Sequence, residues 1–163
     1  MNERVDKNNY YLNIAEEVLR RGTCIRRKWG AVIVKNDEII STGYAGAPRG
    51  RQNCSDLGYC IRQKLQIPRG ERYELCRSEH AEANAIISAE RSDMMDATLY
   101  LTGIEVDTGE YIKGGSSCAM CKRLIINAGI EKVIVRDDEK NYRVIEVKDW
   151  IENDETLEGK SGY

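Results

Sequence analysis

The sequence contains no phenylalanine, a single histidine and only two prolines among its 163 residues. Nine tyrosines and two tryptophans must therefore supply the aromatic contacts of the core. No segment approaches the roughly 18 consecutive apolar residues that a membrane-spanning helix needs, so we expect no membrane partner. Residues 1–11, MNERVDKNNYY, lack the apolar centre of a secretion signal. We therefore expect a cytoplasmic protein whose six cysteines are reduced thiols or metal ligands rather than disulfides.

Charge of neither sign dominates, because 25 Lys and Arg oppose 27 Asp and Glu. The formal net charge of -2 argues against a general nucleic-acid-binding surface, so a bound phosphate would need a local basic patch. A chain of this length is most simply one compact domain, here residues 1–163, and it is long enough to fold without disulfides.

The hydrophobic pattern alternates between helical and strand periodicity. The expected elements are a helix over 9–21, strands over 31–34 and 38–41 joined by a turn at 35–37, a helix over 79–89, a strand over 97–102, a helix over 119–128 and strands over 132–135 and 144–147. Strand–helix–strand alternation predicts parallel pairs, and the hairpin adds an antiparallel pair. We therefore predict a three-layer α/β/α sandwich with a mixed central sheet.

Some expectations concern faces and ends of these elements. The first helix should bury Tyr11, Ile14 and Val18, and the helix over 119–128 should turn Met120, Leu124, Ile125 and Ala128 to the core before Gly129 ends it. A long irregular segment over 44–75 holds both prolines, and loops of this length are usually functional or internally braced. The polar tail from about residue 153 is expected to fray.

The only histidine, His80, opens the predicted helix over 79–89, and Cys118 and Cys121 open the helix over 119–128. The Cys-x-x-Cys spacing places both thiols on one helix face. If the two helices begin at the ends of adjacent strands, these three side chains converge. Two thiolates and an imidazole select zinc, and a set of three leaves the fourth position open for chemistry.

Glu82 follows His80 by two residues and is not needed as a ligand. A carboxylate in that position can act as general acid and base on a water molecule. Other readings of the same residues remain open. Cys-x-x-Cys also serves in disulfide exchange or in half of a structural zinc site, and the chain could be a zinc-stabilised binding module without catalysis.

These segments together resemble the zinc-dependent cytidine/deoxycytidylate deaminase superfamily, whose H-x-E…P-C-x-x-C signature has the same order. The resemblance is to the deoxycytidylate (dCMP) deaminase branch and covers roughly residues 10 to 136, through CIRRKWGAVIVKNDEIISTGY, HAEANAI and CAMCKRLIINAGIEKVIV. It implies the mixed sheet, hydrolytic conversion of dCMP to dUMP for thymidylate synthesis, a possible dNTP effector and a homo-oligomer, often a hexamer. It also implies that His80, Cys118 and Cys121 bind zinc while Glu82 transfers protons.

The resemblance further implies contacts to the pyrimidine edge from the backbone near Ala81, Ser116 and Ser117. Ser117 replaces the proline that usually precedes the first cysteine, and serine also suits a helix start. Within STGYAGAPRG, around Tyr44, the branch commonly has Asn where Ala45 stands, and that Asn contacts sugar or effector. Other substrates therefore remain open, including dCTP, a riboflavin-pathway pyrimidine and a guanine nucleotide. The acidic balance disfavours tRNA.

A substrate phosphate needs positive charge, and arginine forks fit phosphate well. The basic candidates stand before the first strand and beside the glycine-bearing loop: Arg26, Arg27, Lys28, Arg49 and Arg51. With Tyr44, Ala81, Ser116 and Ser117 they complete the expected substrate contacts. Basic residues at such positions are also commonly plain solvated surface.

Four further cysteines, Cys24, Cys54, Cys60 and Cys76, bracket the long segment. Four thiols can make a closed tetrahedral zinc site that contributes folding energy directly. Some phage members of the resembling family carry a second zinc at positions matching Cys24 and Cys54. The alternative is that these thiols are small buried hydrophobic groups.

Overall fold

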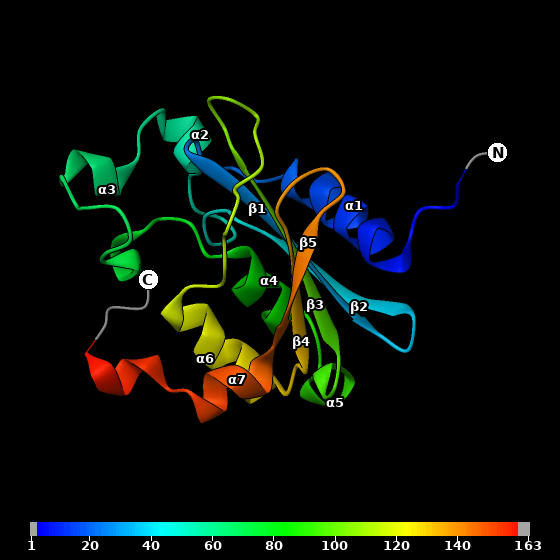
Figure 1. Ribbon diagram of the computed structural model, residues 1–163. Helices are drawn as coiled ribbons and strands as arrows, with labels where there is room; N and C mark the ends of the chain where they lie inside the picture. The colour runs from blue at the N-terminus through cyan, green and yellow to red at the C-terminus, as the bar shows by residue number, and fades with distance from the viewer. Residues whose placement is uncertain (1–2, 160–163) are drawn as a thin grey trace.

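The computed structural model describes residues 3–159, and expectations for residues 1–2 and for the last part of the tail, 160–163, lie outside the described residues. A five-stranded sheet with strand order β2-β1-β3-β4-β5 forms its centre (Figure 1). The strands are β1 Arg27–Lys35, β2 Glu38–Tyr44, β3 Thr98–Glu105, β4 Lys132–Arg136 and β5 Tyr142–Glu146.

The sheet is mixed, as predicted. β3 and β4 are parallel, whereas the β1–β2, β1–β3 and β4–β5 pairs are antiparallel. The alternation of strands and helices predicted more than one adjacent parallel pair, and this part was wrong. β2 and β3 do run in the same direction across a helical connection, but β1 lies between them, so they are not neighbours.

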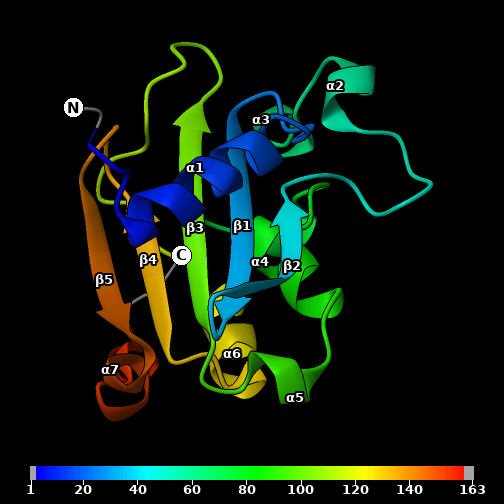
Figure 2. The ribbon, with the colours of Figure 1, turned by 90° about the vertical axis from the view of Figure 1, so that its right-hand side faces the viewer.

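Helices cover both faces of the sheet and complete three layers (Figure 2). α1 Lys7–Leu19 packs on one face, and α4 Ala81–Ile87 and α6 Ala119–Ala128 pack on the other, with α5 Arg91–Met94 and α7 Val147–Glu152 at their ends. Side chains of β1 alternate between the layers, since Val32 faces α1 while Ala31 and Ile33 face the opposite core. This confirms the α/β/α sandwich.

The first helix begins at Lys7 because the Asp6 side chain accepts a hydrogen bond from the Asn9 backbone N–H at 3.0 Å. Its apolar contacts differ from the predicted face, because Ile14 and Val18 are only partly buried. Tyr11 is buried as predicted, and the other buried apolar side chains of the helix are Leu12, Ala15 and Leu19. A Cβ on Gly30 of β1 would lie 2.1 Å from the Ala15 carbonyl oxygen, so the absence of a side chain at residue 30 lets this face of the helix lie against the sheet.

The predicted hairpin is present. Asn36 and Asp37 have φ angles of 50° and 65° and form a two-residue turn between the paired residues Lys35 and Glu38. Two consecutive positive φ angles match the twist of the flanking strands, and Asn and Asp tolerate this conformation better than most residues.

The segment between β2 and α4 is long but ordered by short elements. It contains α2 Cys54–Leu57, α3 Ile61–Lys64 and the 3-10 helix η1 Tyr73–Leu75. At its base, Gly46 and Glu79 exchange backbone hydrogen bonds of 3.2 and 2.8 Å. The segment therefore leaves and returns to one point of the fold, beside the start of α4.

The helix predicted over 119–128 is present at that place, but its buried face and the element after β5 differ from the predictions. α6 spans Ala119–Ala128 as expected and ends at Gly129 with φ 80°. Leu124, however, is 43% exposed, since the buried face is centred on Cys121, Ile125 and Ala128. Val147 was predicted to end a strand but begins α7 instead, and beyond it Glu155–Glu158 form the 3-10 helix η2.

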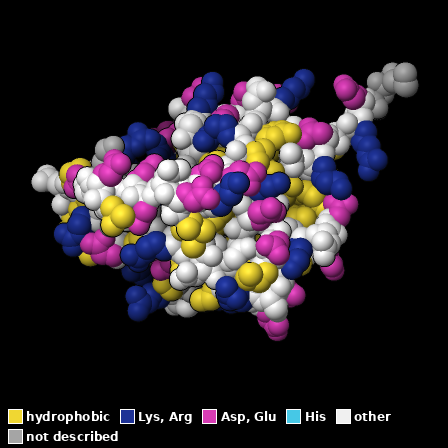
Figure 3. Space-filling view, turned by 60° about the horizontal axis from the view of Figure 1, so that its bottom comes forward, with side chains coloured by type: hydrophobic (Ala, Val, Ile, Leu, Met, Phe, Trp, Pro, Cys, Tyr) yellow, Lys and Arg dark blue, Asp and Glu magenta, His cyan; other side chains and the backbone are white. Residues whose placement is uncertain are grey.

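The surface carries mixed charge. Figure 3 shows basic and acidic side chains intermingled over one face of the molecule, with hydrophobic side chains in scattered groups. Within residues 3–159, every helix falls short of the length and apolar content that crossing a membrane requires.

α4 lies unusually close to β2. Ser41 Oγ donates a hydrogen bond to the Ala85 carbonyl at 2.7 Å, and Asn84 Nδ2 donates to the Tyr44 carbonyl at 2.8 Å. A Cβ on Gly43 would lie 2.3 Å from the Ala81 carbonyl oxygen. The first turn of α4 can therefore occupy its place only because residue 43 lacks a side chain.

We predict that Gly43→Ala destabilises the fold by about 1 to 3 kcal/mol, because the new methyl group would force α4 away from the sheet. Denaturant unfolding monitored by circular dichroism measures the effect. Thr42→Ala, at the exposed neighbouring position, is the matched control and should cost under about 1 kcal/mol. Equal stability of the two variants would contradict the close approach.

Candidate metal centre and pocket

Two helix starts lie side by side behind the sheet. His80 is the N-cap residue of α4, and Cys118 is the N-cap residue of α6. Ala81, Ala85, Cys118 and Cys121 belong to one buried cluster, so the two helices share a core. The small alanines of HAEANAI permit this contact, and the chain after β3 delivers Cys118 to it.

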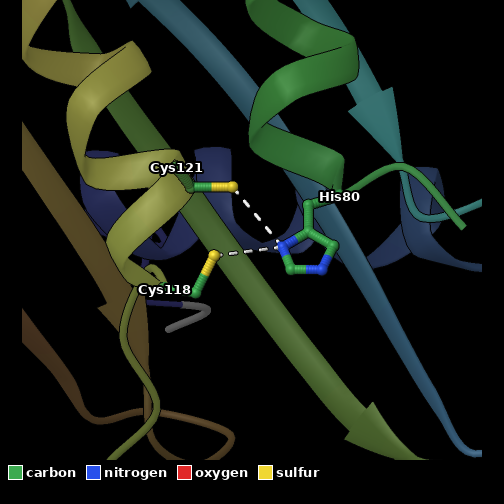
Figure 4. Close-up of side chains that lie close together, drawn as sticks. All are labelled: His80, Cys118 and Cys121. Atoms are coloured by element: carbon green, nitrogen blue, oxygen red, sulfur yellow. Dashed lines mark hydrogen bonds between the residues drawn. The ribbon is translucent and has the colours of Figure 1, made fainter. Parts of the chain in front are cut away.

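The three predicted ligands converge. The sulfur atoms of Cys118 and Cys121 lie 3.4 and 3.5 Å from Nδ1 of His80 and both point toward it (Figure 4). Their ligand atoms all lie within 4.8 Å of one another. Among residues 3–159, this is the only group of three or more Cys, His, Asp or Glu side chains close enough to hold a metal ion.

The spacing of these atoms fits a zinc ion. Tetrahedral zinc, with bonds of about 2.3 Å to sulfur and 2.0 to 2.1 Å to nitrogen, separates a sulfur ligand from a nitrogen ligand by about 3.6 Å. The observed sulfur–nitrogen separations differ from this value by little. Two sulfurs and one imidazole are also the donor set that zinc prefers. The residues therefore fit the metal predicted for them.

The electrostatics of the trio favour a deprotonated thiol. The hydrogen bond with Cys121 and the neighbouring His80 lower the pKa of Cys118 to about 4. Burial lowers the pKa of His80, but its hydrogen bond with Cys118 and the nearby Glu82 carboxylate outweigh burial, so the net shift is upward. The first proton of the cysteine pair is therefore lost readily, as metal binding requires.

Glu82 lies in the first turn of α4 and is 5% exposed. Burial raises the pKa of its carboxyl group, and the charge of His80 partly opposes that rise. It lines the same pocket as His80 and Cys118 without belonging to the ligand trio. A carboxyl group with a raised pKa beside a metal site is suited to proton transfer.

The pocket has a volume of about 270 Å³, and Trp29 forms part of its wall. A Cβ on Gly103 or Gly115 would lie 2.5 or 2.7 Å from the Trp29 ring. These two glycines therefore let the ring lie flat against the backbone. Ala45 also lines the pocket, at the position where the sequence departs from the usual Asn.

Only some of the predicted substrate contacts face this pocket. Arg26, Arg27, Ala81 and Ser116 line it. The others, which do not appear in its lining among the described residues, are Lys28, Tyr44, Arg49, Arg51 and Ser117. Arg49 and Arg51 are exposed. The Tyr44 carbonyl accepts the bond from Asn84 that fixes α4.

The sequence interpretation missed several lining residues, chiefly from the long segment and from β1. They are Trp29, Arg62, Arg69, Tyr73, Ser78 and Ile112. No local pattern distinguishes them, because each faces the pocket only through contacts made far along the chain. Tyr73, for example, packs edge-on against the His80 ring with centroids 5.1 Å apart.

The remaining four cysteines are near neighbours at one side of the pocket. Cys24, Cys60 and Cys76 line it, and burial raises the pKa of Cys54 with a further contribution from the charges of Cys24 and Cys60. Burial likewise raises the pKa of Cys76. No three of these sulfurs lie within 4.8 Å of one another in the part of the chain that the structure describes.

Comparison with known proteins gives a consistent result. Residues 5–137 match the family model described as the cytidine and deoxycytidylate deaminase zinc-binding region. A deoxycytidylate deaminase of Mycobacterium phage D29 is 37% identical over 136 residues, which cover 80% of this chain and 94% of that protein. A deoxycytidylate deaminase of Schizosaccharomyces pombe is 32% identical over 77% of this chain, which spans only 35% of the yeast protein.

A solved structure extends the comparison. The dCMP deaminase of cyanophage S-TIM5, in complex with dCMP and dUMP, is 25% identical and aligns with a TM-score of 0.56. The alignment covers 83% of this chain and 85% of the cyanophage chain. The family-model match, residues 5–137, includes β1 to β4 and both helices of the candidate metal centre.

We predict that Cys121→Ser lowers the zinc content of the protein by about one ion per chain, because a serine hydroxyl is a poor substitute for a thiolate ligand. Inductively coupled plasma mass spectrometry of protein purified without chelator measures the content. Glu82→Gln is the control and should leave it unchanged. A Cys121→Ser protein with the zinc content of wild type would contradict the assigned ligands.

Proposed function

The chain belongs to the cytidine and deoxycytidylate deaminase family, and on this basis we propose that it converts dCMP and water to dUMP and ammonia. The observation that carries the proposal is the buried Glu82 beside His80, Cys118 and Cys121 in one pocket. The cyanophage relative solved with dCMP and dUMP supports this substrate.

The chemistry divides between the metal and the protein. A zinc ion held by His80, Cys118 and Cys121 would supply Lewis-acid activation of the water that replaces the amino group. Glu82 accepts the proton that this water loses. It delivers that proton to N3 of the ring. It then takes the proton of the new C4 hydroxyl group and passes it to the departing amino group, so that ammonia leaves as the C4 carbonyl forms.

The pocket walls orient the ring. We propose that the backbone at Ala81 and Ser116 contacts the polar edge of the pyrimidine, since both residues line the pocket. Trp29 and Ile112 offer apolar surface for the ring faces and exclude water. The buried position of Glu82 keeps its carboxyl group available for both directions of proton transfer.

Because of Ala45, substrates other than dCMP remain alternatives. The residue lines the pocket but offers only a methyl group, so it makes no polar contact with a sugar. dCTP, a riboflavin-pathway pyrimidine or a guanine nucleotide would use the same metal and the same Glu82. Ammonia release from a panel of these compounds ranks them, and a preference for any of them over dCMP would replace our first choice.

Two functions without deamination are less well supported. A binding module has no use for a buried carboxyl group beside its metal ligands, yet Glu82 is 5% exposed at that place. A disulfide-exchange protein would leave His80 idle, whereas its Nδ1 lies within 3.5 Å of both sulfurs.

We propose a second zinc ion at Cys24, Cys54, Cys60 and Cys76. The support is the gathering of four thiols around one side of the pocket, where the Ser55 backbone N–H donates to the Thr23 carbonyl at 3.1 Å and ties α2 to the chain before β1. The sulfurs must move closer to share an ion. Such a closed site would brace the long segment.

We also propose that the chain forms a homo-oligomer, with six copies as the resemblance implies. We further propose that a dNTP effector acts on it and that it works in the cytoplasm. Apolar side chains exposed on neighbouring helices, Ile87 at 82% and Leu124 at 43%, are consistent with covered surface in an assembly. A single-chain mass in sedimentation velocity would overturn the assembly.

We predict that wild-type protein releases ammonia from dCMP and that Glu82→Gln lowers kcat by at least about 100-fold, because the amide cannot accept the proton from water. A coupled ammonia assay measures both. Zinc content and thermal unfolding of Glu82→Gln should match wild type. A fully active variant would contradict the role of Glu82, and a zinc-replete wild-type protein inactive on dCMP would contradict the proposed substrate.

We predict two zinc ions per chain in wild type and one in Cys54→Ser, since three thiols hold structural zinc less well than four. The Cys54→Ser protein should also unfold at lower denaturant concentration, because the metal contributes folding energy. Cys121→Ser, which affects the other site, is the matched control for stoichiometry. A count of one ion in wild type would remove the second site.

A further inference from the structure

Arg62 is a buried cation in the long segment. It lies on α3, is 5% exposed and lines the pocket that contains Glu82. Burying a guanidinium group is costly unless its charge is compensated. We therefore expect a negatively charged group next to the Arg62 guanidinium.

The protein contacts of Arg62 are all neutral. Its Nη2 donates to the backbone carbonyls of Pro68 at 3.1 Å and Glu71 at 2.5 Å, and its guanidinium lies 4.5 Å from the centre of the Tyr73 ring. Among residues 3–159, no carboxylate lies within 4.0 Å of it, and its Nε is buried without a hydrogen-bond partner. Glu74, the second residue of η1, forms its ion pair with Arg72, which lowers the pKa of Glu74, and the charge of Arg62 contributes to that lowering from farther away.

The rest of the pocket is short of negative charge. Glu82 is the only carboxylate in its lining among the described residues. Arg27 is paired with Glu105 at 2.7 Å, and Arg69 approaches the same carboxylate at 3.8 Å. Arg26 lines the pocket half-buried and makes no ion pair in the described part of the chain. Within the described residues, Arg26 and Arg62 are therefore the two arginines of the lining that form no ion pair.

We infer that Arg62 binds the phosphate of the substrate, together with Arg26, and makes the enzyme select a nucleoside monophosphate over the free nucleoside. This rests on the proposed function. A phosphate supplies negative charge, and a guanidinium N–H donates a charge-assisted hydrogen bond to it. Its Nη2 is engaged by the two carbonyls and its Nε is buried, so Nη1 of Arg62 is the donor left for that purpose.

The same contacts hold Arg62 at a fixed place relative to the reacting end of the pocket. Tyr73 stacks on its guanidinium and packs edge-on against His80. One aromatic ring thus separates the phosphate-binding group from a metal ligand, and the sugar of a nucleotide spans such a gap. The two carbonyls of residues 68 and 71 hold Nη2 and so orient the guanidinium group before substrate binds, which reduces the entropy cost of ordering it.

Two structural roles compete with this inference. Arg62 could serve only to order the segment through Pro68 and Glu71, or its charge could compensate the thiols of the cysteine group, since it lowers the pKa of nearby Cys76 while burial raises it. Either role would affect all substrates alike. Recognition of phosphate would affect only those substrates that carry it.

The test compares kcat/KM for dCMP and for deoxycytidine in wild type and in Arg62→Gln. We expect the dCMP value to fall by about 10- to 100-fold, as loss of a charged hydrogen bond does, while the deoxycytidine value stays within about twofold. Lys64→Gln removes the same charge from the exposed face of α3 and is the control, which should behave as wild type. Arg26→Gln, at a less buried position, should show a smaller loss of the same kind.

The outcomes separate this inference from the proposed function. Equal losses on both substrates in Arg62→Gln, with or without loss of zinc, would overturn it, as would a wild-type enzyme with no preference for dCMP. If wild type turns over neither substrate, the proposed function is wrong, but the phosphate site is not yet tested. Calorimetric titration with inorganic phosphate then tests the phosphate site. Binding to wild type and Lys64→Gln but not to Arg62→Gln supports the phosphate site, and equal binding to all three overturns it.

Discussion

The contact between the His80 ring and the two sulfurs of α6 depends on two helices that begin beside each other on one face of the sheet. α6 connects the parallel strands β3 and β4, and such crossovers place the helix start at the end of the first strand. α4 reaches the same place because Gly43 and two alanines let its backbone approach β2 and the core. The metal centre is therefore a consequence of close backbone packing rather than of flexible side chains reaching across a cleft.

The candidate metal ligands and the rest of the pocket lining come from different parts of the chain. The metal ligands and Glu82 come from two short motifs at helix starts, whereas Arg62 and Tyr73 come from the long segment and Trp29 from β1. The charge of the pocket lining also differs from that of the surface. Over the face shown in Figure 3, acidic and basic side chains are intermingled, while the pocket lining holds four arginines and one carboxylate. A change in the long segment can therefore alter which molecule enters without altering the reacting groups.

Several features of the fold could be predicted because neighbours along the chain decide them. The turn at Asn36 and Asp37 depends on two residues that tolerate positive φ, and the end of α6 depends on Gly129. The predictions were less accurate where burial depends on distant partners. Leu124 satisfied the helical spacing but lies at the edge of the contact between α6 and the core, and Val147 begins a short helix that packs against the core instead of ending a strand.

The sequence by itself determined the candidate ligand set, since His80, Cys118 and Cys121 are identified by residue type and by spacing at two helix starts, and the structure brings them together. The proposed role of Glu82 also rests on its position in the sequence, two residues after His80. The sequence did not determine which basic residues face the substrate. Arg26 and Arg49 are equally polar in the sequence, yet only Arg26 lines the pocket, and Arg62 was not a candidate at all. The reason is physical: ligand identity is a property of side-chain atoms and their local spacing. The charge of a pocket depends instead on which segments, far apart in the chain, the tertiary structure places around one volume and which of their charges remain unpaired.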